Sequence, residues 1–196
     1  RGMYCFRRSA LGVTRGRKAH LFGSGAIMTE VLEAATLLEA AGIAADIWSV
    51  TSYNELCREA LRAERRDRVG AGDQRPYVQQ LLAGEHGVFV AASDYMKALP
   101  LSIARWVPGP YVVLGTDGYG LSESREDLRR HFEVSAADIA YAAASALACE
   151  RSQPSEPGAF QGFCFHDLRY QAITELSEAG ATWPPTIHAT FDPSCL

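Results

Sequence analysis

The sequence predicts an α/β domain in which helices cover both faces of a mostly parallel sheet. Four short segments are almost continuously apolar, as strands buried on both faces are. These segments are residues 19–23, 45–50, 87–92 and 111–115. Segments with apolar side chains at helical spacing lie between them. Strands that alternate with helices in this way build right-handed βαβ units in one layered domain.

Three helices are expected between these strands. Residues 26–41 carry one apolar stripe, and Gly42 follows as a stop signal. The stripe consists of Ile27, Val31, Ala34, Ala35 and Leu38. The second helix, residues 53–68, also has one apolar side. We expect Pro100 to break or bend the third helix, residues 95–106.

Two capping boxes mark the helices that follow the last strand. Ser124 precedes Asp127 by three residues, and Ser135 precedes Asp138 by the same spacing. Each serine can therefore accept a hydrogen bond from the backbone of its own helix. The second box opens residues 136–149, which are rich in alanine, so we expect this helix to pack closely against another element.

The composition limits the class of protein. The chain has 196 residues, of which 47% are hydrophobic and 21% charged, as in a globular domain that buries a full core. Its net charge of -4 argues against a nucleic-acid surface built on general basicity. No apolar run approaches the roughly 20 residues of a membrane helix. The basic N-terminus has no apolar segment after it, which argues against a secretory signal.

The cysteines, histidines and known catalytic motifs indicate no active site or metal site in this chain. The five cysteines are scattered and never in C-x-x-C spacing, so we expect reduced thiols in the cytoplasm and no disulfide framework. No set of His, Cys and acidic residues has the spacing of a zinc site. Neither a G-x-S-x-G elbow nor a P-loop occurs. We therefore assign no catalytic, cofactor-binding or metal-binding residue.

A change of composition divides the chain near residue 150. Residues 1–150 form the predicted α/β domain, and residues 151–161 have the Pro, Ser and Gly content of a linker. Residues 162–196 form an irregular tail with one helix at about 166–179, foreign to the domain before it. From the first residues we expect that the chain begins inside a longer polypeptide.

Two glycine-rich turns are candidate sites. Gly23 and Gly25 lie where a strand meets a helix, as in a dinucleotide-binding loop, but Met28 holds the position of the third glycine. A tight strand-to-helix turn is therefore favoured there. Asp117 lies in the turn 115–120 at the carboxyl edge of the sheet, where open α/β sheets bind ligands. It could act as a base or a ligand, or it could stabilise its own turn through nearby amides.

The residues after this second turn form a candidate interface. Six polar side chains there could hold an anion or the carboxylate of a partner. They are Ser122, Ser124, Arg125, Arg129, Arg130 and His131. The alternative is a capped helix with a solvated face.

Five segments in one order carry a resemblance to a known family. They are residues 20–28, 46–56, 92–97, 114–120 and 124–134. Their sequences closely resemble the C-terminal domain of the homodimeric, thiamine-dependent pyruvate dehydrogenase component, and the resemblance extends over about residues 2–149. The resemblance implies a transketolase-type, three-layer domain with a mostly parallel sheet of about five strands. It also implies a structural and dimerising role, with the catalytic histidines in two preceding domains.

The resemblance implies cofactors and partners for the full-length enzyme. That enzyme decarboxylates pyruvate on thiamine diphosphate with magnesium and acetylates the lipoyl group of dihydrolipoyl acetyltransferase. The implied partners are the missing N-terminal and middle thiamine-binding domains, a second copy and the acetyltransferase. Thiamine enzymes resemble one another in a Gly-Asp-Gly segment followed by an Asn pair, whereas this chain has a single asparagine, Asn54. We therefore expect no cofactor in this chain and no activity when it is isolated.

The chain departs from the family in two places. Leu121 stands where an arginine is common in related sequences. The closing helices expected after Ala148 are replaced by the tail.

The tail has a resemblance of its own. Residues 162–180 look like the His-x-x-Arg box of phage-type tyrosine recombinases, in which His166 and Arg169 would contact the scissile phosphate. Tyr170 replaces the usual histidine and the nucleophilic tyrosine is absent, so we expect no DNA cleavage. A lone amphipathic helix is the alternative. For the whole chain, the alternatives to a silent enzyme domain are a stand-alone interaction module and a piece of a DNA recombinase.

Overall fold

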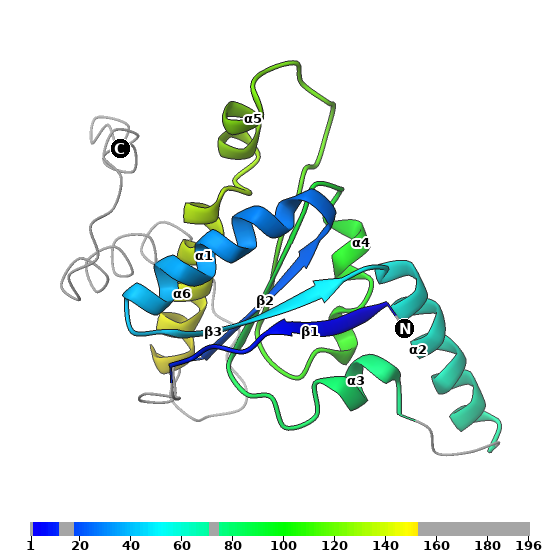
Figure 1. Ribbon diagram of the computed structural model, residues 1–196. Coiled ribbons are helices and arrows are strands. Elements are labelled where there is room, and N and C mark those ends of the chain that lie inside the picture. Colours follow the sequence, from blue (N-terminus) through cyan, green and yellow to red (C-terminus); the bar gives the residue numbers. More distant parts are fainter. Residues whose placement is uncertain (1, 12–17, 71–74, 153–196) are drawn as a thin grey trace.

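The computed structural model describes residues 2–11, 18–70 and 75–152, and it has the predicted α/β class. Five strands form one sheet in the order β1-β3-β2-β4-β5 (Figure 1). β1 pairs antiparallel with β3, and all other pairs are parallel, which confirms a mostly parallel sheet. The strands are β1 (Met3–Arg7), β2 (Lys18–Ser24), β3 (Ala44–Val50), β4 (Val88–Ser93) and β5 (Tyr111–Leu114).

Helices cover both faces of this sheet (Figure 1). α1 and α6 pack on one face, and α2, α3 and α4 lie on the other. α5 stands apart, at the end of the loop that follows β5. The helices are α1 (Met28–Ala40), α2 (Tyr53–Arg68), α3 (Tyr77–Leu81), α4 (Ala98–Leu101), α5 (Arg125–His131) and α6 (Ala136–Ser152), with short 3-10 turns at η2 (Gly25–Ile27) and η3 (Ala104–Trp106).

Successive residues of each central strand enter two different cores. In β2, Leu21 packs among aliphatic side chains under α1 and α6, whereas Phe22 joins an aromatic core under α2. Trp48 of β3 and Phe89 of β4 are buried in that same aromatic core. Both faces of the strands are thus buried, and this explains why they are apolar at nearly every position.

The alanines of α6 serve the close packing that the sequence predicts. Ala140 and Ala143 are buried in the aliphatic core that α6 shares with α1. Both capping boxes form as well. The Ser124 hydroxyl accepts from the Asp127 amide at 3.2 Å, and the Ser135 hydroxyl accepts from the Asp138 amide at 3.4 Å. α6 continues to Ser152, two residues into the segment expected to be a linker.

Three elements differ from the sequence-based expectation. β1 is an edge strand whose buried Met3 alternates with exposed side chains, so it lacks the continuous apolar pattern of the other strands. α3 is only five residues long, too short to show a helical period. The helix expected at 95–106 is instead α4 followed by η3. Pro100 lies inside the first turn of α4, where no intrahelical bond needs its missing amide hydrogen, so it is not the point of the break.

One stretch of the described chain, residues 125–150, is long and apolar enough by composition to cross a membrane. The chain bends between α5 and α6, however, at residues 132–135. α6 also buries Ile139 and Leu147 in the aliphatic core. This is the pattern of a core helix that packs against a sheet.

Gly87, just before β4, lies against the backbone of β2, so a substitution there tests how closely these two strands approach. Its φ is +116°, and a Cβ atom there would lie 2.1 Å from the backbone oxygen of Lys18. Gly42 also has a positive φ, +73°, but has open space around it. We predict that Gly87→Ala lowers the free energy of unfolding by about 3 kcal/mol or more, and Gly42→Ala by only about 1–2 kcal/mol. Urea unfolding of both variants checks this, and equal losses would contradict the described approach of β4 to β2.

Candidate functional site

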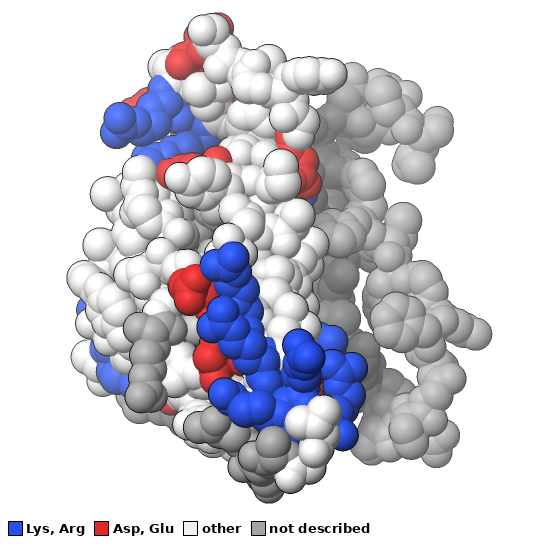
Figure 2. All heavy atoms as spheres, turned by 90° about the vertical axis from the view of Figure 1, so that its right-hand side faces the viewer, with Lys and Arg blue, Asp and Glu red and all other residues white. Residues whose placement is uncertain are grey.

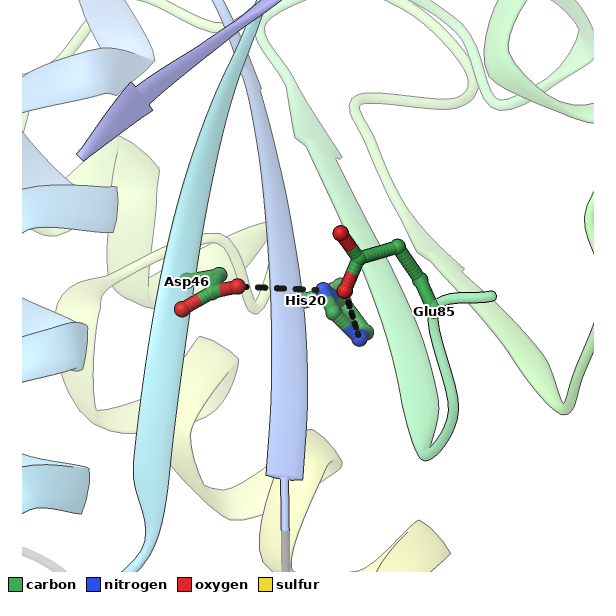
Figure 3. A group of neighbouring side chains, drawn as sticks. All are labelled: His20, Asp46 and Glu85. Carbon is green, nitrogen blue, oxygen red and sulfur yellow. Dashed lines mark ion pairs between the residues drawn. The ribbon is translucent and has the colours of Figure 1, made fainter. Parts of the chain in front are cut away.

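The amino edge of the sheet holds a cluster of polar side chains that the sequence did not predict. His20 of β2, Asp46 of β3 and Glu85, before β4, place potential ligand atoms within 4.8 Å of one another (Figure 3). The three residues lie far apart in the sequence, and only the parallel register, which sets His20 opposite Asp46, brings them together. Their chemistry therefore has to be judged from their neighbours.

Two cations already occupy the carboxylates of this cluster. Arg8 lies 2.5 Å from Asp46 and 2.6 Å from Glu85. Lys18 lies 2.9 Å from Asp46 and 3.1 Å from Glu85. The Ser9 amide donates to the other oxygen of Asp46 at 2.9 Å. The group is an ion-pair network, which we call the Asp46 network and define as Arg8, Lys18, Asp46 and Glu85.

His20 stands beside this network as a neutral side chain. The indole N–H of Trp48 can only donate, so Nδ1 of His20, 3.3 Å away, accepts. Nε2 therefore carries the proton and donates to the backbone oxygen of His86 at 3.1 Å. The ring also stacks on Phe89 with centroids 4.7 Å apart. Both nitrogens are thus engaged, and His20 has no lone pair free for a metal ion.

The pKa values of the cluster agree with this description. Burial lowers the pKa of His20 and so disfavours its protonated form. The contacts drawn in Figure 3, at 3.9 Å to Asp46 and 3.8 Å to Glu85, would be ion pairs only if His20 were protonated. Burial alone would raise the pKa of Asp46, but the Ser9 amide, Lys18 and Arg8 hold it below its ordinary value. Burial likewise opposes ionisation of Glu85, yet Arg8 and Lys18 keep its pKa lowered. The amino edge is thus electrostatically satisfied.

The opposite, carboxyl edge of the sheet is open. A hollow of about 450 Å³ lies between the loops after β4 and β5, α5 and η2. Its lining residues are Ala26, Asp94, Thr116, Gly118, Tyr119, Gly120, Leu121, Glu123, Arg125, Leu128, Arg129, Phe132 and Val134. The hollow combines an apolar floor with charges of both signs at its rim.

Asp117 holds a neighbouring loop rather than its own turn. One oxygen of its carboxylate accepts from the Lys97 amide at 3.0 Å, and the other lies 3.7 Å from the Lys97 ammonium. Thr116 adds two bonds, from its amide to the oxygen of Tyr95 at 3.0 Å and from its hydroxyl to the oxygen of Asp94 at 2.7 Å. The loops after β4 and β5 are therefore tied into one surface, and Asp117 is engaged in that tie.

Of the six candidate interface residues, Arg125 and Arg129 line the hollow. Ser124 is the cap of α5, and Ser122 is exposed in the loop before it. His131 is exposed at the end of α5 and packs edge-on against Phe132. The structure thus brings the two arginines to the hollow, and the other four candidates are not among the residues that line it. His166 and Arg169 of the tail lie outside the described residues.

The neighbouring Arg129 fixes α5 in place. Its guanidinium lies 2.6 Å from Glu30 of α1. The other oxygen of Glu30 accepts from the amide of Ala136 at 2.8 Å, at the start of α6. One carboxylate therefore connects three helices beside the hollow.

The Gly23–Gly25 turn has the geometry of a tight strand-to-helix connection. Gly25 has a φ of +66°, and a Cβ atom on Gly23 would lie 2.3 Å from the sulfur of Met28. The Met28 side chain thus fills the space above Gly23 that a pyrophosphate would need in a dinucleotide site. This geometry supports the tight-turn interpretation.

Large apolar side chains gather at the carboxyl edge. Tyr119 is 95% exposed and Leu121 is 51% exposed in the loop after β5. Exposed apolar residues also follow β4, and these are Tyr95, Met96, Leu99 and Leu101. We call these six residues the carboxyl-edge patch. The patch was not predicted from the sequence, although bulky apolar residues inside a glycine-rich turn are a usable signal, because exposed apolar side chains can mark an interaction site.

Comparison with known proteins identifies relatives of this domain. A family model described as the transketolase-like C-terminal domain matches residues 2–135. The pyruvate dehydrogenase E1 component of Pseudomonas aeruginosa is 50% identical over 133 residues, which are 65% of this chain and 15% of that protein. The E1 component of Mycolicibacterium smegmatis is 41% identical over 152 residues, 76% of this chain and 16% of that protein. The chain thus spans about a sixth of the length of these relatives.

A solved structure shows the same fold. Transketolase from Pichia stipitis aligns with a TM-score of 0.51 and 16% sequence identity, over 78% of this chain and 19% of the transketolase chain.

The buried neutral His20 predicts a pH dependence of stability. Its pKa in the folded state is below the ordinary value of 6.5. As the pH falls through about 6.5, the unfolded chain takes up a proton that the folded chain does not, so the free energy of unfolding decreases. We expect His20→Gln to flatten this decrease between about pH 6.5 and 5, in urea unfolding measured at a series of pH values.

The further loss below about pH 4.5, where the unfolded chain protonates its equivalents of Asp46 and Glu85, should persist in His20→Gln. His131→Gln, a matched change at an exposed position on α5, should leave the wild-type profile. An unchanged slope between pH 6.5 and 5 in His20→Gln would rule out this role of the buried ring.

Proposed function

The chain belongs to the family of transketolase-like C-terminal domains, and we propose that it is the assembly domain of a pyruvate dehydrogenase E1-type enzyme. In that context the enzyme would decarboxylate pyruvate and acetylate a lipoyl group of an acetyltransferase. This domain would pack against the other domains of the same polypeptide and against a second copy of the enzyme. Residues 1–150 would form the domain, 151–161 a linker and 162–196 an appended tail. The free cysteines Cys5, Cys57 and Cys149 suit the cytoplasm.

The carboxyl-edge patch is the observation that carries this proposal. Its six large apolar side chains come from two loops and α4, and the bonds of Asp117 and Thr116 hold the two loops together. Exposed apolar surface of this kind is stabilised when another protein surface covers it. A second copy or a neighbouring domain would cover it in an E1-type enzyme.

The residues of this domain do not fit thiamine diphosphate. Asp117 is the one acid of the glycine-rich turn, and it is engaged with Lys97. Asn54, the single asparagine, is exposed on α2 on the aromatic-core face of the sheet, away from this turn. The cofactor and magnesium would therefore belong to the part of the enzyme outside this chain.

A chimera tests the proposed function. Residues 2–135 of this chain, which the family model matches, would replace the corresponding segment of the Pseudomonas aeruginosa E1 component. We expect the chimera to assemble and to decarboxylate pyruvate in the presence of thiamine diphosphate and Mg²⁺, and the isolated chain to show no turnover. Turnover by the isolated chain would refute the assembly role, as would a folded chimera that neither assembles nor reacts.

The carboxyl-edge patch makes a separate prediction in the same chimera. Tyr119→Ser together with Leu121→Ser should weaken assembly by about tenfold or more, because truncated apolar contacts at an interface cost about 1–2 kcal/mol each. The matched control is Leu11→Ser with Val69→Ser, two exposed apolar residues outside the patch. Sedimentation over a concentration series measures the effect. Equal weakening by both pairs would show that the patch is not the assembly surface.

A further inference from the structure

The outer face of α2 presents a row of arginines. Figure 2 shows it as a blue band on the side of the molecule where α2 lies. The arginine stripe, as we call it, consists of Arg58, Arg62, Arg65, Arg66 and Arg68, all of them exposed. The opposite side of α2 buries Leu56, Ala60 and Ala63 against the sheet.

The acidic residues of α2 are mostly engaged elsewhere. Glu59 accepts from the amide of Tyr77 at 2.8 Å. Glu64 accepts from the indole N–H of Trp106 at 2.8 Å and pairs with Arg105 at 2.6 Å. Glu55 pairs with Arg58 at 3.3 Å. The fourth acid, Asp67, is exposed near the end of the helix. Among the described residues, no carboxylate lies within ion-pair distance of Arg62, Arg65, Arg66 or Arg68.

Helix stability accounts for only part of this stripe. Arg65, Arg66 and Arg68 lie in the last turn, where positive charge interacts favourably with the helix dipole. Arg62 lies in the middle of the helix, one turn from both Arg58 and Arg66, and like charges at this spacing destabilise a helix. An external anionic partner would remove that repulsion.

The chemistry of the stripe favours a protein carboxylate over a nucleic acid. α2 contains five arginines and no lysine. Arginine is enriched in protein interfaces, where lysine is depleted, and its planar fork binds carboxylates in pairs. Leu61, which is 48% exposed among these arginines, adds an apolar contact. The stripe extends only about 15 Å and has no exposed aromatic side chain for base stacking, and the chain carries a net charge of -4.

We infer that the arginine stripe is a docking surface for an acidic segment of a partner protein. Carboxylates one helical turn apart on that segment would pair with Arg62 and Arg65, and an apolar side chain would cover Leu61. The stripe shares no residue with the carboxyl-edge patch, so this inference does not rest on the proposed assembly role.

Binding of a fluorescein-labelled peptide of ten glutamates to the full chain tests this inference. Fluorescence anisotropy at low salt should show saturable binding that weakens as salt is added. Arg62→Gln with Arg65→Gln should weaken binding by about tenfold. Arg62→Lys with Arg65→Lys should fall between this variant and wild type, because it keeps the charge and loses the fork. Both arginines are exposed, so circular dichroism should be unchanged.

The control changes the same charge on a different helix. Arg125→Gln with Arg130→Gln on α5 should leave peptide affinity at the wild-type value. Equal weakening by the two glutamine pairs, or no saturable binding at all, would overturn the inference. Tighter binding of a DNA duplex than of the peptide, through the same arginines, would replace it with a nucleic-acid surface. Loss of self-association in Arg62→Gln with Arg65→Gln would instead make a second copy the partner.

Discussion

A parallel sheet that is buried on both faces leaves mainly the loops at the ends of its strands and the outer sides of its helices for interaction with other molecules. In this domain an aliphatic core fills one face of the sheet and an aromatic core fills the other. The residues of the central strands β2, β3 and β4 are therefore committed to packing, whereas the edge strand β1 leaves Tyr4 and Phe6 about half exposed. Most of the surface that remains for function comes from the loops at the strand ends or from the solvent side of a helix.

The two ends of the strands have opposite character. At the amino edge, the Asp46 network pairs each carboxylate with two cations and joins the residue after β1 to β2, β3 and the turn before β4. Such a closed network fixes the edge strand and leaves little charge for a ligand. At the carboxyl edge, polar bonds organise the loops internally, while large apolar side chains face the solvent. The domain is thus closed by ion pairs at the amino ends of its strands and leaves apolar side chains exposed at the carboxyl ends.

Most of the fold was predictable from the sequence, because periodicity and capping are local signals. The strands β2 to β5, the helices α1, α2 and α6, and both caps follow from residues within one element. The missing parts depend on contacts between distant segments. β1 takes its place by pairing with β3, more than 40 residues away in the sequence. The amino-edge cluster exists only because strand register aligns His20 with Asp46, although a histidine and an aspartate within such apolar strands were a usable signal.

The candidate site was less predictable than the fold for a related reason. Asp117 and Arg125 were identified by residue type and position, but their roles depend on their contacts in the fold. Asp117 is engaged by Lys97, whereas Arg125 lines the open hollow. The surface proposed for assembly is apolar, whereas a search by residue chemistry selects charged groups.

Hydrogen–deuterium exchange of the Pseudomonas aeruginosa chimera, compared with the isolated chain, tests the central claim most directly. The claim predicts new protection in the chimera at residues 93–101 and 114–124, around the carboxyl-edge patch. The amino-edge segments around Lys18 and Glu85 should exchange alike in both forms. Protection confined to the amino edge, or none at either edge, would contradict the account.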